Sequence, residues 1–203
     1  MRLVIGISGS SGAIYGIRLL EMLREFDDVE THLVISRYGR LNIELETDYQ
    51  VSDVEALADV VHGEKNQAAS IASGSFGVDG MIVAPCSMKT LSGIVNSYAD
   101  SLLVRAADVC LKERKQLVLM PRETPLHPGH CKLLYEASVL GAIIAPPMPA
   151  FYSQPNTLDD IVNHSVGRVL DLFGLDSGTV KRWQGPTSRA GLATQEGSDK
   201  SQG

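Results

Sequence analysis

The sequence predicts an α/β protein with a doubly wound, Rossmann-like parallel sheet flanked by helices in a single domain. One observation is that short apolar runs, typical of buried strands, alternate with longer segments that repeat apolar residues at helical spacing. A second is that 203 residues without an internal repeat or a linker fit one domain. A third is that polar residues follow five of the expected strands, where sheets of this class bind ligands.

The expected strands are short and apolar, and they cover residues 2–7, 30–35, 81–84, 116–120 and 141–145. The expected helices each have an apolar face, and they cover residues 13–25, 41–47, 53–61, 86–98, 102–114, 129–140 and 157–173. Ser52 and Glu55 have the spacing of a capping box at the start of the third helix. Because strands and helices alternate, we expect the strands to run parallel.

Residues 1–184 form the expected domain, and residues 185–203 form an expected disordered tail of small, polar and charged residues. The net charge of −6 disfavours nucleic acid as a partner, and no apolar run has membrane-spanning length. The three cysteines are odd in number and far apart, which indicates a reducing compartment and no disulfide framework. We therefore expect a cytoplasmic protein that binds neither nucleic acid nor a membrane.

The first candidate site is the turn Gly9-Ser10-Ser11-Gly12, between the strand 2–7 and the helix 13–25. A helix N-terminus presents unpaired N–H groups, and glycine lets an anion approach the backbone. The glycine spacing matches neither the dinucleotide fingerprint nor the lysine-bearing P-loop. The turn therefore predicts either a phosphate site or a tight connection that binds nothing.

Two later turns offer similar chemistry. Ser87 to Thr90 follow the strand 81–84 and supply hydroxyls at a helix start, although Ser87 alone is also an ordinary N-cap. Arg122-Glu123 lies between two prolines after the strand 116–120. An arginine grips phosphate and a carboxylate moves protons, so this pair is a candidate for chemistry, with a surface ion pair as the alternative.

Other candidates have ordinary structural explanations beside the functional ones. Tyr152 and Trp183 are consistent with packing, and Arg168 with a cation near a helix C-terminus. Glu46 and Lys112, taken alone, are typical solvated helix charges.

Metal and thiol chemistry is not expected. His127 and His130 have no carboxylate or cysteine partner at ligand spacing, so we expect no metal site. Cys86 lies at a helix start, where a nucleophile is conceivable, but a buried structural thiol is the commoner use.

Several segments together resemble the flavin prenyltransferases of the UbiX type. They are Gly9–Gly16, Glu46–Asp48, Pro85–Ser92, Arg105–Val109, Leu111–Arg114, Pro121–Leu126 and Pro149–Tyr152, and the resemblance runs from residue 2 to about Trp183. The resemblance implies an enzyme that transfers a dimethylallyl group from dimethylallyl monophosphate to N5 and C6 of reduced FMN without a metal. It also implies a dodecamer with active sites at subunit interfaces. The product, prenylated FMN, would serve a UbiD-type decarboxylase in ubiquinone biosynthesis or aromatic-acid decarboxylation.

The resemblance also implies roles for individual residues. The implied FMN contacts are Gly9, Ser10, Ser11, Ser36, Ser87, Met88, Lys89, Thr90, Arg105 and Arg122. The implied prenyl-donor contacts are Tyr152, Arg168, Lys112 and Trp183, and the implied catalytic residues are Ser11, Glu46, Glu123 and Lys112.

The sequence departs from the family pattern at Tyr38, Pro128 and Ser153, and Ser153 adjoins the implied donor site. Two other functions remain open at this point: a non-catalytic FMN-binding subunit of a decarboxylase complex, and a flavin-dependent decarboxylase. The catalytic histidine and substrate motif of the related cysteine decarboxylases are not found.

Overall fold

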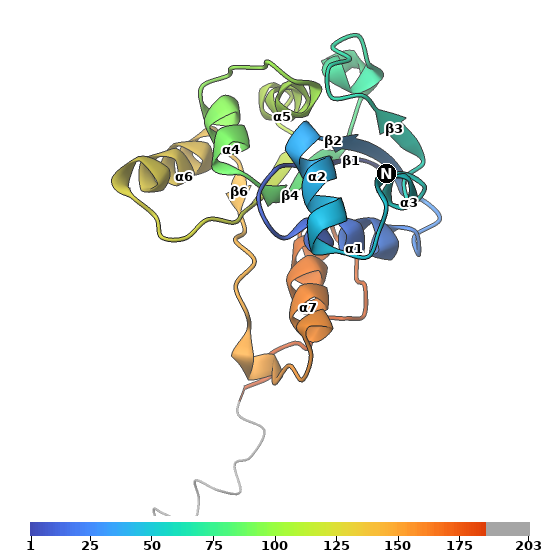
Figure 1. The fold of residues 1–203 in the computed structure, drawn as a ribbon, viewed down its shortest axis with the longest axis vertical. Helices are drawn as coiled ribbons and strands as arrows, with labels where there is room; N and C mark the ends of the chain where they lie inside the picture. Colours follow the sequence, from blue (N-terminus) through green and yellow to red (C-terminus); the bar gives the residue numbers. More distant parts are fainter. Residues whose placement is uncertain (186–203) are drawn as a thin grey trace, which may run out of the picture.

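Six parallel strands form one sheet in the computed structural model, which describes residues 1–185 (Figure 1). Their order across the sheet is β3-β2-β1-β4-β5-β6. The bounds are β1 Arg2–Ile7, β2 Glu30–Ile35, β3 Val60–His62, β4 Gly80–Cys86, β5 Gln116–Pro121 and β6 Ile143–Ile144. The doubly wound fold predicted from the sequence is thereby confirmed.

Helices cover both faces of this sheet (Figure 1). One face carries α1 (Ala13–Leu23), α2 (Arg37–Glu46), α3 (Val51–Glu55) and α7 (Leu158–Asp171), and the other carries α4 (Met88–Val95), α5 (Leu102–Lys112) and α6 (Pro128–Leu140). Neighbouring strand residues alternate between the two cores: Leu3 and Ile5 pack with α1, whereas Val4 packs with α5. Burial on both faces explains why the strands read as nearly continuous apolar runs. Within residues 1–185, no helix has the length and apolarity that crossing a bilayer requires.

The turns after β1 and β4 are joined by one buried hydroxyl, that of Ser8. Its Oγ donates to the Pro85 carbonyl at 2.8 Å and accepts from the Ser87 N–H at 2.7 Å, and the Ser8 N–H donates to the same carbonyl at 3.2 Å. We call this arrangement the Ser8 bridge. It fixes the two turns relative to each other at the carboxyl edge of the sheet.

The structure corrects the helix that was expected over residues 53–61, because a strand, β3, occupies the end of this range. The sequence pattern extended a helix over 53–61, but α3 ends at Glu55 and Val60–His62 pair with His32–Val34 of β2. The run of β-branched Val60 and Val61 suits a strand, and edge pairing with β2 overrides the helical pattern. The capping box is also shifted: Gln50 is the N-cap and Asp53 its partner, rather than Ser52 and Glu55.

The second helix begins earlier than expected. Ser36 Oγ accepts the Gly39 N–H at 3.0 Å, so α2 begins at Arg37 rather than at Leu41. The N-cap supplies an acceptor for an otherwise unpaired helix donor. This start places the end of β2 and the first turn of α2 beside the turn that follows β1.

Candidate active site

A cavity of about 380 Å³ lies at the carboxyl ends of β1, β2 and β4. The strand order reverses direction at β1, and in doubly wound sheets a ligand binds in the crevice at that point. We call this the switch-point cavity. Its predicted lining residues are Gly9, Ser36, Ser87, Lys89 and Thr90, and its further lining residues include Arg37, Tyr38, Glu64 and Lys65.

The hydroxyls of this cavity are already in use as helix caps. Ser87 Oγ accepts from the Thr90 N–H at 3.2 Å and donates to Thr90 Oγ1 at 3.1 Å. Ser87 is therefore the N-cap of α4 and also a wall of the cavity, so the structural and the functional interpretations both apply. Met88 lies in the same first turn and packs toward the core beneath α4.

The Glu46 side chain, which the sequence alone suggested to be a solvated helix charge, contacts the N-terminus of α1. Its carboxylate accepts the Gly12 N–H at 2.7 Å and the Ala13 N–H at 3.3 Å, so it occupies the N-terminus of α1. The protein thus supplies its own anion where the sequence suggested an external phosphate. Ser11 is exposed beside this carboxylate, and Ser10 Oγ is buried without a hydrogen-bond partner among the described residues.

Arg122 and Glu123 lie on the loop after β5, and both are exposed. The Arg122 N–H donates to the Cys86 carbonyl at 3.3 Å, and Glu123 Oε1 accepts the Thr124 N–H at 3.0 Å. Burial raises the pKa of Tyr15, and the positive charge of Arg122 opposes that rise. The two neighbours do not form the surface ion pair considered as an alternative.

A second cavity, of about 330 Å³, lies between α7 and the segment that follows β6. We call this the arm cavity. Its walls are largely apolar and include Met120, Ala145, Pro146, Pro147, Met148, Val169 and Leu172. Three side chains, Tyr152, His164 and Arg168, bring a hydroxyl, an imidazole and a cation to it. An apolar hollow with a few polar groups is the usual form of a small-molecule site.

Arg168 and the C-terminal segment meet at one carboxylate. Asp171 accepts from Arg168 at 2.6 Å and from both terminal nitrogens of Arg182 at 2.9 and 3.0 Å. Hydrogen bonds from Arg182, and then from Arg168, hold the pKa of Asp171 below its usual range. The neighbouring Trp183 ring lies edge-on to Tyr152 with ring centroids 5.8 Å apart.

Several predicted residues line neither cavity, and two of them, Arg105 and Lys112, lie on α5. Arg105 donates to the Ala72 carbonyl at 3.1 Å and pairs with Asp108 at 2.6 Å. Lys112, at the end of α5, pairs with Glu113. Neither residue lines the switch-point cavity or the arm cavity.

The structure gives Cys86 and His127 structural roles. Complete burial raises the pKa of the Cys86 thiol to about 12, so this sulfur is neutral at physiological pH. His127 Nδ1 accepts the Gly129 N–H at 3.0 Å and caps α6, with Pro128 at the first helical position, where its missing N–H is tolerated.

The sequence interpretation missed His164 and Asp171. His164 is four residues before Arg168 on one helix, so both face the same side, and that spacing was an available signal. Asp171 follows Arg168 by three residues, so the helical spacing could likewise have predicted their ion pair. Its second partner, Arg182, lies in the segment after α7, which has no periodicity to place it.

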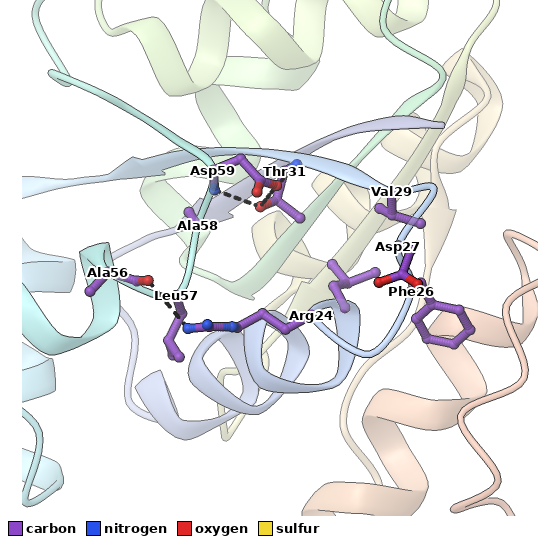
Figure 2. A pocket seen from close by; sticks show the side chains of 10 residues that line it. Arg24, Phe26, Asp27, Val29, Thr31, Ala56, Leu57, Ala58 and Asp59 are labelled. Atoms are coloured by element: carbon purple, nitrogen blue, oxygen red, sulfur yellow. Dashed lines mark hydrogen bonds between the residues drawn. The ribbon is translucent and has the colours of Figure 1, made fainter.

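A hollow of about 330 Å³ lies at the opposite, amino-terminal edge of the sheet, and none of the predicted site residues lines it (Figure 2). One of its two carboxylates, Asp59, accepts both the N–H and the hydroxyl of Thr31, at 2.7 and 2.8 Å. Its arginine, Arg24, donates to the Ala56 carbonyl at 3.4 Å (Figure 2). These groups hold β2, β3 and α1 together, whereas the polar groups that line the two carboxyl-edge cavities include unpaired donors.

The fold and the two cavities define a doubly wound α/β protein with two hollows at the carboxyl ends of its strands, where proteins of this fold bind their ligands. A family model described as flavoprotein matches residues 1–170. The chain is 58% identical over 186 residues to the flavin prenyltransferase UbiX of Escherichia coli K12, covering 91% of this chain and 98% of that protein. It is 57% identical to UbiX of Thauera aromatica, covering 93% and 97%. The chain therefore belongs to the flavoprotein family, in its UbiX group of flavin prenyltransferases.

Solved structures agree with this assignment. A dodecameric FMN-dependent UbiX-like decarboxylase from Escherichia coli O157:H7 superposes with a TM-score of 0.90 at 56% identity, covering 91% of this chain and 100% of that one. AnUbiX in complex with FMN and dimethylallyl pyrophosphate superposes with a TM-score of 0.89 at 50% identity, covering 91% and 98%.

Proposed function

We propose that this protein transfers a dimethylallyl group from dimethylallyl monophosphate to N5 and C6 of reduced FMN. The observation that carries the proposal is that the carboxyl edge holds two cavities, one lined by hydroxyls and lysine and the other apolar with Tyr152 and Arg168. A flavin and a phosphorylated donor need two such places. A carrier of FMN alone has no use for a second phosphate site, and a flavin-dependent decarboxylase needs no prenyl donor.

The residues of the switch-point cavity fit FMN. Ser36, Ser87 and Thr90 offer hydroxyls, and Lys89 offers a cation, to a phosphate. The buried Ser10 Oγ lacks a partner among the described residues, and a polar ligand atom would supply one. We assign Arg122 to the same ligand because its backbone N–H is bonded to the Cys86 carbonyl, next to Ser87 of this cavity.

Reduced FMN, when bound, supplies the nucleophilic N5 and C6 atoms. The residues of this chain neutralise the departing phosphate and move protons. Arg168 and the Tyr152 hydroxyl stabilise the negative charge that develops on the phosphate as its bond to carbon breaks. The apolar walls of the arm cavity exclude water from the allylic cation. This preorganised charge removes the need for a metal.

Glu46 and Glu123 are the proton-handling groups in this scheme. Glu123 is exposed on the loop after β5 and accepts the C6 proton, directly or through the phosphate. Glu46 is held by two amide donors at the start of α1, beside Ser11 and next to the turn that we assign to the flavin.

We place Arg105 and Lys112 at a neighbouring subunit's site. Both lie on α5 away from the two cavities of their own chain, and a related UbiX-like protein is dodecameric. In the assembly, Lys112 adds a cation beside the donor phosphate of the adjacent subunit. Trp183 and Tyr152 are 65% and 45% exposed in one chain, and such an interface would cover them.

The product, prenylated FMN, passes to a UbiD-type decarboxylase in the cytoplasm. Ubiquinone biosynthesis and aromatic-acid decarboxylation are the two pathways that such a cofactor serves, and the donor pocket is compatible with both.

The test is to incubate the protein with reduced FMN and dimethylallyl monophosphate in the presence of a metal chelator, and to weigh the flavin. The expected flavin is heavier by C5H8. An unchanged flavin mass with the monophosphate and with dimethylallyl pyrophosphate would overturn the proposal. FMN bound without prenylation would support the carrier.

A further inference from the structure

Tyr152 contacts a buried histidine, His164, that has no role in the proposed reaction so far. His164 of α7 is 7% exposed, and its Nε2 lies 3.2 Å from the Tyr152 hydroxyl. The two rings meet edge to face with centroids 5.6 Å apart. A buried imidazole in contact with a phenol constrains both the position and the proton of that phenol.

The need for such a constraint follows from where Tyr152 lies. It belongs to a three-residue 3-10 turn, Phe151–Ser153, in the segment between β6 and α7 (Figure 1). That segment follows the two-residue strand β6 and has little ladder pairing of its own. A tyrosine on such a turn needs a partner on a rigid element if its hydroxyl is to be placed accurately.

The rigid element is α7, which also carries Arg168. His164 and Arg168 are four residues apart, so they lie one turn apart on the same face of the helix. Through His164, the Tyr152 hydroxyl is therefore placed relative to the same helix that places the guanidinium. The distance between the Tyr152 hydroxyl and the Arg168 guanidinium is then set by α7 rather than by the irregular segment before it.

We propose that His164 is the positioning residue for Tyr152 in prenyl transfer, which rests on the proposed function. Its Nε2–H donates to the Tyr152 oxygen, so the phenol proton points away from the imidazole and toward the donor phosphate. Tyr152 then donates to the phosphate as the carbon–oxygen bond breaks. With the opposite tautomer, the phenol would donate its proton to the imidazole, and that proton would then be unavailable for a hydrogen bond to the phosphate.

The experiment is a double-mutant cycle on the full chain with Tyr152→Phe, His164→Leu and the pair of both. Single-turnover prenyl transfer is measured at saturating reduced FMN over a range of dimethylallyl monophosphate concentrations. We expect His164→Leu to lower the maximal rate about tenfold, which equals about 1.4 kcal/mol and one hydrogen bond, with FMN affinity unchanged. In the Tyr152→Phe background the same change should alter the rate less than about twofold, because the hydroxyl to be positioned is already absent.

A conservative variant separates positioning from packing. His164→Gln keeps an amide near the place of Nε2 and should retain the rate within about threefold, whereas the shorter His164→Asn should lose it as the leucine does. His62→Leu, another buried histidine on β3, is the control for lost imidazole packing and should leave the rate per folded molecule unchanged. If His164→Leu fails to fold, the Gln and Asn pair carries the test alone.

Calorimetry of dimethylallyl monophosphate with oxidised FMN present gives a second readout that needs no turnover. The loss of affinity for dimethylallyl monophosphate that His164→Leu causes should also disappear in the Tyr152→Phe background. An equal effect of His164→Leu in both backgrounds, or an active Asn variant, would overturn the proposal. A wild-type protein that binds the donor but makes no prenylated flavin would instead overturn the proposed function and leave the binding cycle to decide the role of His164.

Discussion

At the scale of single residues, the two arginines near the cavities are held in different ways. Arg168 is hydrogen-bonded to Asp171 on its own helix, in the wall of the arm cavity. Arg122 lies on the loop after β5, donates its backbone N–H to the Cys86 carbonyl, and forms no ion pair with any described residue. We expect them to serve different ligands.

Arg168→Ala should leave FMN binding intact and slow prenyl transfer, while Arg122→Ala should weaken FMN. A charge-assisted hydrogen bond to phosphate contributes about 1.5–3 kcal/mol, so each change should cost about ten- to a hundredfold in its own reaction. FMN affinity by fluorescence titration and single-turnover transfer at saturating flavin measure the two effects. Should Arg168→Ala lose FMN and keep a normal saturated rate, the assignment of the two cavities is reversed.

Part of the switch-point cavity, namely Gly9, Ser36, Ser87, Lys89 and Thr90, was predictable, because the carboxyl ends of parallel strands converge and polar side chains follow those ends in the sequence. The place of Glu46 was not predictable, because it depends on how α2 packs beside α1 over a separation of 34 residues. The Tyr152–His164 contact is closer in sequence, at 12 residues, but it joins an irregular segment to a helix. Periodicity places neither partner of such a contact.

At the scale of elements, the Asp171 carboxylate ties the C-terminal segment to α7, beside a hydrogen bond from Thr179 Oγ1 to the Asn163 carbonyl at 3.2 Å. Asp171 pairs with Arg182, and the next residue, Trp183, packs against Tyr152. Since the pKa of Asp171 is lowered on folding, this attachment is fully present above the ordinary aspartate pKa and is lost only as the pH falls through the lowered value.

Asp171→Asn should release this segment at neutral pH. Trp183 is the single tryptophan of the chain, so its fluorescence anisotropy reports the release directly and should fall. The control is Asp159→Asn, which breaks a pair with Arg18 near the start of α7 and should leave the anisotropy unchanged. An unchanged anisotropy in Asp171→Asn would mean that the other contacts of the segment, among them Thr179 with Asn163 and Trp183 with Tyr152, hold Trp183 in place.

The pairing of β2 with the unexpected strand β3 predicts an acid sensitivity. His32 Nδ1 lies 2.8 Å from His62 Nε2, and burial lowers the pKa of both. Glu30 and Asp59 face His32 and favour its charged form, whereas Arg2 opposes it. Since the folded pKa values lie below the unfolded value of about 6.5, the unfolded chain binds more protons as the pH falls.

Stability should therefore decline as the pH falls from about 6.5 through the lowered folded values, above the range in which most carboxylates titrate. Melting temperatures at pH 7.5 and 5.5 should differ less in His32→Gln than in the wild type. His130→Gln, on α6 and remote from β2 and β3, serves as the matched control and should keep the full difference. If His32→Gln keeps it too, another group is responsible.

There is a physical reason why the sequence did not predict the strand β3. A three-residue edge strand is defined by its neighbour, and the same valines fit a helix or a strand when read alone. The five strands that were predicted are longer or more central, apart from β6, whose expected span of five residues shrinks to two because Gly141 still belongs to the end of α6. Helix ends set by side-chain caps were located within a few residues.

At the scale of the whole molecule, both buried cores are built from residues up to Leu175. The predicted tail beyond the domain lies outside the described residues, apart from Gly185. A chain ended at Gly185 should keep its melting temperature and its FMN affinity, because no core residue is removed. A clear loss of either, measured beside the full chain, would show that residues 186–203 contribute to the fold or to the assembly.

The Ser8 bridge has a consequence for the kinetics of ligand capture. A loop that becomes ordered only on binding costs about 1–2 kcal/mol of backbone entropy for each residue, and its rearrangement limits the rate at high ligand concentration. Here the turns after β1 and β4 are fixed to one buried hydroxyl when the chain folds. Mixing with FMN in a stopped-flow instrument should give one phase whose rate rises linearly with flavin concentration. In Ser8→Ala, that linear rise should bend to a plateau, because the ordering of the two turns then becomes a step of its own.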